Sequence, residues 1–198
     1  MRRAPDRSLD RRDASLKDRP VRDDYANRDV MILGLSIATF TNLHVAISLI
    51  GIVFGLVVLY GMLGAQRMPG WTALFLATTV VTSVTGFMFP AVTITPAAIF
   101  GAISLVVLAV ALLALYAFHA NGAWRWIYVV TALFALYLNV FVLVVQAFQK
   151  IAVLHPLAPN GSEPPFLVAQ TIVLFTSLWL GFGAVRKFRP EAMAPARR

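Results

Sequence analysis

Six polar side chains in or beside the apolar segments of this sequence could hold a ligand: His44, Asn139, Gln146, His155, Glu163 and Gln170. Imidazole is a common ligand of haem iron and other metals, and amides and carboxylates hydrogen-bond polar ligand groups. Unpaired amides are costly in lipid, so several such groups at one depth predict a cavity open to one membrane face. The alternative interpretation is that these groups only bond across helix interfaces.

The sequence lacks the residues and motifs that most catalytic mechanisms require. The sequence has no cysteine, which excludes disulfides, iron–sulfur clusters and thiolate metal sites. It contains no H-E-x-x-H, Walker, G-x-S-x-G or G-x-G-x-x-G motif. General acid–base catalysis usually needs paired carboxylates or a positioned histidine, and the apolar part offers the single carboxylate Glu163. The sequence therefore favours a protein that is not an enzyme, with no catalytic residue and no metal site assigned.

The composition indicates lipid as the solvent. Hydrophobic residues make up 59% of the 198 residues and charged residues only 13%, unlike a soluble domain of this length. Between residues 31 and 185 the charged side chains are Arg67, Arg125, Lys150 and Glu163, all between apolar runs. The basic residues of this part lie at the ends of apolar runs, where the orientation of the chain in a membrane explains them. The net charge of +8 therefore does not indicate a nucleic-acid partner.

We expect an all-α integral membrane bundle of about five transmembrane helices, because charge-free runs of this length match the hydrocarbon core. The predicted spans cover residues 43–64, 72–89, 96–118, 126–148 and 164–185, with Thr95 as a cap for the third. Residues 1–30 are predicted to be a disordered charged tail, or an extension before a true start at Met31. The membrane domain is expected over 31–188, followed by a short basic tail over 189–198.

The positions of the basic residues predict the orientation. Arg67, Arg125 and the basic C-terminal residues share one side of a five-span arrangement. Positive-inside counting places that side, and the C-terminus, in the cytoplasm and the N-terminus outside. His44, Gln146 and Gln170 then lie in the outer half of the membrane, and the loop 149–165 with His155 and Glu163 could cover a cavity there.

Gly51 and Gly55 form a G-x-x-x-G pattern, which lets helices approach closely. This glycine face is typical of helix packing, within the chain, in a homo-oligomer or in a larger membrane complex. A redox subunit is an alternative, with haem held by His44 and His155, or quinone by His44, Gln146 and Gln170. A small permease is a further alternative, disfavoured because no ionisable residue lies near the middle of a span.

Four stretches carry a resemblance to a known group: residues 44–61, 74–90 and 124–148, and SEPPFLVAQ at 162–170. They resemble small multi-span integral membrane proteins of bacteria that have no assigned activity, over about residues 40–190. The resemblance implies a bacterial inner-membrane protein and draws attention to Glu163 and Gln170. We expect a non-enzymatic small subunit, a scaffold or a binder of a lipophilic ligand, with the lipid bilayer as its surroundings.

Overall fold

The computed structural model describes residues 31–90 and 96–189. The chain divides into two units, residues 1–39 and 40–198. In the first unit, strands β1 (Met31–Ile32) and β2 (Leu35–Ser36) pair antiparallel, with Met31 opposite Ser36. Helix α2 begins directly after β2, where the Ser36 hydroxyl accepts a hydrogen bond of 3.2 Å from the Thr39 N–H. This is N-cap geometry, and it explains why the helix begins at Ile37 rather than near residue 43.

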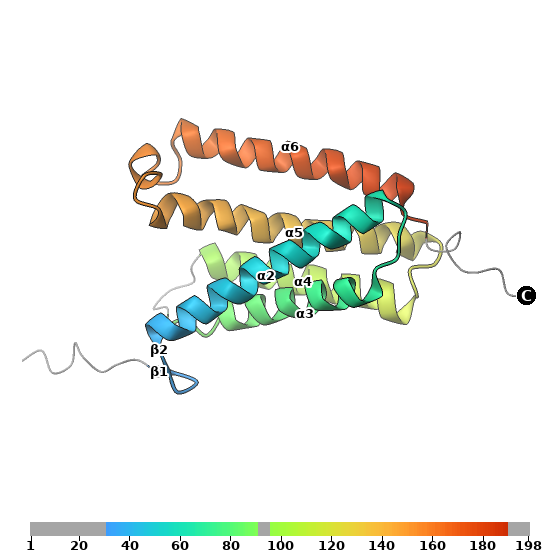
Figure 1. Ribbon diagram of the computed structural model, residues 1–198, viewed down its shortest axis with the longest axis horizontal. Coiled ribbons are helices and arrows are strands. Elements are labelled where there is room, and N and C mark those ends of the chain that lie inside the picture. Colours follow the sequence, from blue (N-terminus) through green and yellow to red (C-terminus); the bar gives the residue numbers. More distant parts are fainter. Residues whose placement is uncertain (1–30, 91–95, 190–198) are drawn as a thin grey trace, which may run out of the picture. The chain divides into compact units, whose positions relative to one another are not determined.

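Within the described residues, the helices form the expected all-α bundle. They are α2 (Ile37–Leu63), α3 (Pro69–Gly86), α4 (Pro96–Leu112), α5 (Ala123–Lys150) and α6 (Pro164–Lys187), shown in Figure 1. A five-residue π-helical segment, η1 (Leu113–Ala117), continues α4, and the 3-10 turn η2 (His155–Leu157) lies between α5 and α6. Prolines occupy the first turns of α3, α4 and α6, where a missing N–H costs nothing. The expected cap Thr95 lies outside the described residues.

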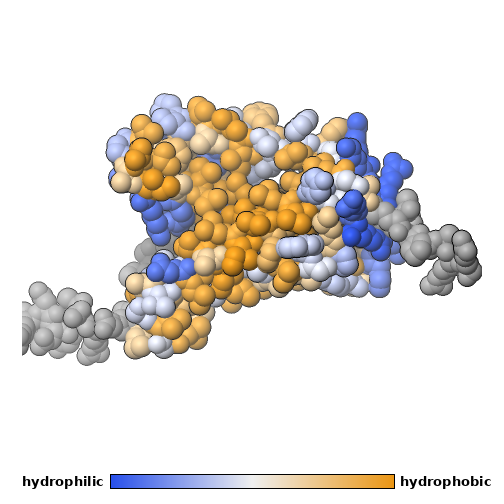
Figure 2. Space-filling model, in the orientation of Figure 1, coloured by the Kyte–Doolittle hydropathy of each residue, from blue (hydrophilic) through white to orange (hydrophobic). Residues whose placement is uncertain are grey.

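In the part of the chain that the structure describes, four helical segments are long and apolar enough to cross a membrane: Ile37–Leu63, Ala98–Ala117, Ala123–Lys150 and Pro164–Lys187. Figure 2 shows the matching pattern, with apolar residues across the middle of the helices and polar residues gathered at their ends. Helix α3 has 18 residues, a length of about 27 Å at 1.5 Å per residue. It also carries five threonines and a serine. The fifth span therefore stays a prediction.

Helix α5 is the centre of the packing and contacts α3, α4 and α6. Its small residues Ala132 and Ala135 are fully buried, so neighbouring helices approach its backbone closely. Helix α6 is the opposite case, because only Gln170 and Ala184 of its residues are buried. Helices α4 and α6 thus pack closely against α5, and α3 packs against α4.

Candidate functional site

The six candidate ligand-binding residues lie mainly toward one end of the helices, where α2, α4 and α6 begin and α3 and α5 end (Figure 1). We call this the His44 end. The opposite end, where α2 meets the α2–α3 turn and α5 begins, is called the Arg67 end. The two ends use their polar residues in different ways.

His44 is held between α2 and the end of α3. Its Nδ1 lies 2.8 Å from the Thr85 hydroxyl, and its ring packs edge-on against Phe89 at 5.2 Å. The single Thr85 hydroxyl proton already points to the Val81 carbonyl at 2.7 Å. Thr85 therefore accepts from His44, which puts the imidazole proton on Nδ1. This arrangement joins two helices and leaves only Nε2 for any ligand.

Asn139 also bonds across a helix interface. Its Nδ2 donates to the Thr79 hydroxyl at 3.3 Å, and Thr79 is fully buried. One turn along α3, the Ser83 hydroxyl donates to Ser104 of α4 at 3.1 Å. The threonine and serine side chains of α3 thus serve as connections to α4 and α5.

Gln146 and Gln170 do not meet. Gln146 lies two turns beyond Asn139, on the side of α5 that faces α3. Gln170 approaches α5 from α6 and donates to the Phe141 carbonyl at 3.1 Å. The Oε1 atoms of both glutamines, and the Thr82 hydroxyl, are buried without a hydrogen-bond partner among the described residues. A cavity shared by the two glutamines therefore has no support in this arrangement.

Glu163 organises its own loop. Its carboxylate accepts hydrogen bonds from the Asn160 N–H and side-chain amide, and from the Ser162 N–H, at 2.9 to 3.1 Å. Slight desolvation raises the pKa of Glu163, but these donors outweigh it, so the pKa lies below its ordinary value. His155 is exposed in η2, and its ring makes no hydrogen bond within the described residues.

No two of the six predicted residues are joined by a hydrogen bond in the described parts of the chain. These parts also hold no cluster of three metal-ligating side chains. For haem, His44 offers one nitrogen, and the exposed His155 ring makes no contact with it. For quinone, the two glutamines stand on different sides of α5. The residues present do not fit either group as one site.

Gly51 and Gly55 pack against helices of the same chain. A Cβ on Gly51 would lie 3.1 Å from the Thr78 hydroxyl. A Cβ on Gly55 would lie 2.6 Å from Leu136 and 2.9 Å from Phe75. The glycine face therefore contacts α3 and α5.

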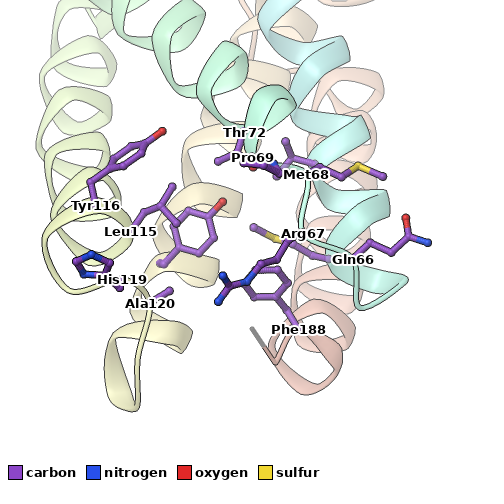
Figure 3. A pocket seen from close by; sticks show the side chains of 13 residues that line it. Gln66, Arg67, Met68, Pro69, Thr72, Leu115, Tyr116, His119, Ala120 and Phe188 are labelled. Atoms are coloured by element: carbon purple, nitrogen blue, oxygen red, sulfur yellow. The ribbon is translucent and has the colours of Figure 1, made fainter. Parts of the chain in front are cut away.

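The Arg67 end contains a cavity of about 210 Å³. Its walls come from the end of α2, the α2–α3 turn, η1, α5 and the residue after α6, as Figure 3 shows. Most of the lining is apolar, including Val58, Met62, Met68, Leu115 and Phe188. Arg67 and His119 enter from opposite sides (Figure 3), and the Tyr128 hydroxyl lies beside Thr72 on the inner wall. None of the six predicted residues lines this cavity, which we call the Arg67 pocket.

The two arginines at this end have different roles. Arg125 donates to the Val185 and Phe188 carbonyls at 2.7 and 2.6 Å, which caps the end of α6 and positions Phe188 in the pocket wall. Arg67 is exposed, and none of the described residues accepts a hydrogen bond from it. Arg125 is therefore structural, whereas the guanidinium of Arg67 is available to a ligand.

The backbone beside the pocket is unusual. The π-helical segment supplies Leu115 and Tyr116 to the lining, and His119 and Ala120 follow with positive φ of 55° and 51°. Non-glycine residues rarely adopt this conformation, and both features are frequent at functional sites. The sequence gives Arg67 and His119 only as residues at span ends, so their position around one cavity could not be predicted from spacing.

A second cavity, of about 290 Å³, lies between α2, α5 and α6. Its lining is almost entirely apolar, with Tyr137, Thr176 and Ser177 as the polar members. No charged side chain is among the residues that line it.

Comparisons with known proteins give no indication of function, so the structural observations above are its basis. No family model matches the sequence, and no curated protein or solved structure matches it. The helices show an apolar body suited to a lipid bilayer, and the described residues place an amphipathic cavity at its Arg67 end.

Proposed function

We propose that this integral membrane protein binds an amphipathic, lipophilic ligand in the Arg67 pocket. The observation that supports the proposal most strongly is the combination of apolar walls with an exposed arginine that has no partner among the described residues. Ligand sites usually have this composition, with few polar groups that fix the orientation of an apolar molecule. The π-helical turn and the left-handed residues at its edge support the same location.

The size of the pocket limits how the ligand binds. A volume of about 210 Å³ is below the roughly 300–1,000 Å³ of pockets that enclose a whole drug-sized molecule. The ligand is therefore expected to place one end in the pocket and to leave its remaining chain in the lipid.

The lining favours binding over catalysis. It contains one imidazole and no carboxylate or thiol, so the usual acid–base pairs are missing. We propose a bacterial inner-membrane location, with the N-terminus outside. Because the basic Arg67 end is then cytoplasmic, ligands would enter from the inner leaflet.

Filling the pocket tests this proposal. Leu115→Trp adds an indole to the lining, and Leu113→Trp adds the same group two residues away at an exposed position. The probes are dodecanol and dodecyl phosphate, measured by thermal stabilisation of the detergent-purified full chain. We expect Leu115→Trp to lose stabilisation by at least one probe, while Leu113→Trp keeps it. Equal stabilisation of both variants would overturn the proposal.

A second candidate function, a small subunit that packs on another chain, has its own observation. Phe175, Trp179 and Phe182 of α6 are 64%, 74% and 58% exposed, and few residues of this helix are buried. The chain has no cysteine, so Trp179→Cys gives a single reactive site. Oxidative cross-linking in native membranes should yield a dimer if two copies meet there. Tyr60→Cys, exposed on α2, is the control, and monomer only would count against a homo-oligomer.

A further inference from the structure

We infer that the ligand of the Arg67 pocket carries a phosphate group attached to an apolar chain. This inference rests on the proposed function and names the chemical class of its ligand. Its first basis is charge. In the described ranges, 31–90 and 96–189, the single acidic side chain is Glu163, which lies at the His44 end and is bound by its own loop. Among the described residues, the positive charge of Arg67 thus has no counter-charge near it.

The second basis is the geometry of the two polar groups. Arg67 and His119 lie on opposite sides of the same cavity (Figure 3). A guanidinium can donate two parallel hydrogen bonds to one pair of phosphate oxygens. A tetrahedral phosphate then keeps further oxygens directed away from that pair, toward the facing side. A planar carboxylate bound in the same way has no third oxygen directed toward the facing side, where His119 lies.

The third basis is the state of His119. Its Nδ1 lies 3.2 Å from the Ala117 carbonyl, which can only accept, so Nδ1 carries a proton. Nε2 is therefore the nitrogen that remains for a ligand. A phosphate monoester exchanges its second proton near a pKa of about 6. It can accordingly donate to Nε2 or accept from it, which few other anionic groups can do near neutral pH.

Apolar walls favour a lipid phosphate over free phosphate as the source. The cavity is lined by Met62, Met68 and Leu115, whose side chains donate no hydrogen bond to an anion such as free phosphate. An attached chain would cover these side chains and continue into the lipid. The expected ligand is thus a long-chain phosphate, such as a lipid with a terminal phosphate group.

The experiment compares three probes on the full chain in detergent: dodecyl phosphate, dodecanol and inorganic phosphate. Arg67→Gln removes the charge. Arg67→Lys keeps the charge but cannot donate the two parallel hydrogen bonds of a guanidinium. Lys187→Gln removes a charge at the same end from a residue outside the lining and is the matched control. Because hydrogen bonds to charged groups are strong, Arg67→Gln should weaken dodecyl phosphate binding roughly 10- to 100-fold. Arg67→Lys should lose less, and Lys187→Gln should bind nearly as the unaltered chain does.

Each result has a distinct meaning. Tighter binding of dodecyl phosphate than of dodecanol, lost in Arg67→Gln, would support the inference. Equal binding of dodecyl phosphate and dodecanol would overturn the phosphate inference. The proposed binding of an amphipathic ligand would still stand, provided that Leu115→Trp blocks the binding of both probes. Inorganic phosphate binding as tightly as dodecyl phosphate would overturn the lipid source. Binding unaffected by Leu115→Trp would overturn the proposed function itself.

Discussion

The two ends of the helical bundle use polar side chains differently. At the His44 end, the imidazole bonds Thr85, and Asn139 bonds Thr79 deeper in the interior, so both groups connect helices. At the Arg67 end, the guanidinium has no partner among the described residues and lies on a cavity. Polar residues inside apolar helices therefore indicate packing here. A cavity that could hold a ligand is found instead where helix ends and turns leave space beside the charged side chain of Arg67.

The largest effect is expected where the packed region has no room. Gly55→Leu would place a side chain where even a Cβ lies 2.6 Å from Leu136 and 2.9 Å from Phe75. Overpacking of this kind should cost roughly 3 kcal/mol of unfolding free energy, measured by unfolding in mixed micelles. Gly70→Leu is the control, because a Cβ on Gly70 meets nothing within 4 Å. Similar stability of both variants would show that α2 does not pack as described.

A smaller effect is expected for His44→Ala. Losing the hydrogen bond to Thr85 and the contact with Phe89 should cost about 1 kcal/mol of unfolding free energy. Binding of dodecyl phosphate should be unchanged, because His44 lies at the other end. If His44→Ala abolished a visible absorption band of a bound haem, or the binding of dodecyl phosphate, the functional site would lie at the His44 end instead.

A still smaller coupling is expected between Asn139 and Thr79. Hydrogen bonds between membrane helices contribute about 0.6 kcal/mol on average in double-mutant cycles. The cycle of Asn139→Leu and Thr79→Val, measured by unfolding in mixed micelles, should give a coupling of about this size. A coupling near zero would mean that their 3.3 Å contact contributes nothing to stability.

The smallest effect is local and depends on pH. The pKa of Glu163 is lowered by its loop donors, so the stability it contributes is present above the ordinary pKa of a glutamate. That contribution is lost as the pH falls through about 4 and below. The protection factors of the amides in the 158–165 loop, which correct for the slower intrinsic exchange in acid, should therefore fall between pH 7 and pH 4, with those of the helices unaffected. Glu163→Gln should show low protection of this loop at both pH values; high protection in this variant at neutral pH would contradict the assignment.

The fold could be predicted from the sequence more fully than the site. Apolar runs bounded by Pro96, Pro164 and the charged loops indicate the helices, because length and hydropathy are local properties. The early start of α2 was missed, since it depends on the short hairpin and the Ser36 cap. The five-residue π segment before His119 was missed as well.

The Arg67 pocket could not be predicted for a different reason. Arg67, His119 and Phe188 are far apart in the chain, and the cavity exists only because α2, η1, α5 and the end of α6 converge. From the sequence alone, Arg67 indicated orientation, and His119 only follows the end of the predicted span 96–118. The six polar candidates, in contrast, predicted a cavity at the His44 end, where no hydrogen bond joins two of them in the described parts of the chain. Which residues contact a ligand there or elsewhere stays a prediction.

Photolabelling tests the central claim, that the ligand binds at the Arg67 end, most directly. A dodecyl phosphate with a diazirine on its first carbons would be irradiated with the full chain, and the labelled peptides would be identified by mass spectrometry. We predict labelling within residues 58–72 and 115–120, which supply much of the pocket lining, and competition by excess unlabelled dodecyl phosphate. Competed labelling around His44, Gln146 or Gln170, with none at the Arg67 pocket, would contradict the account.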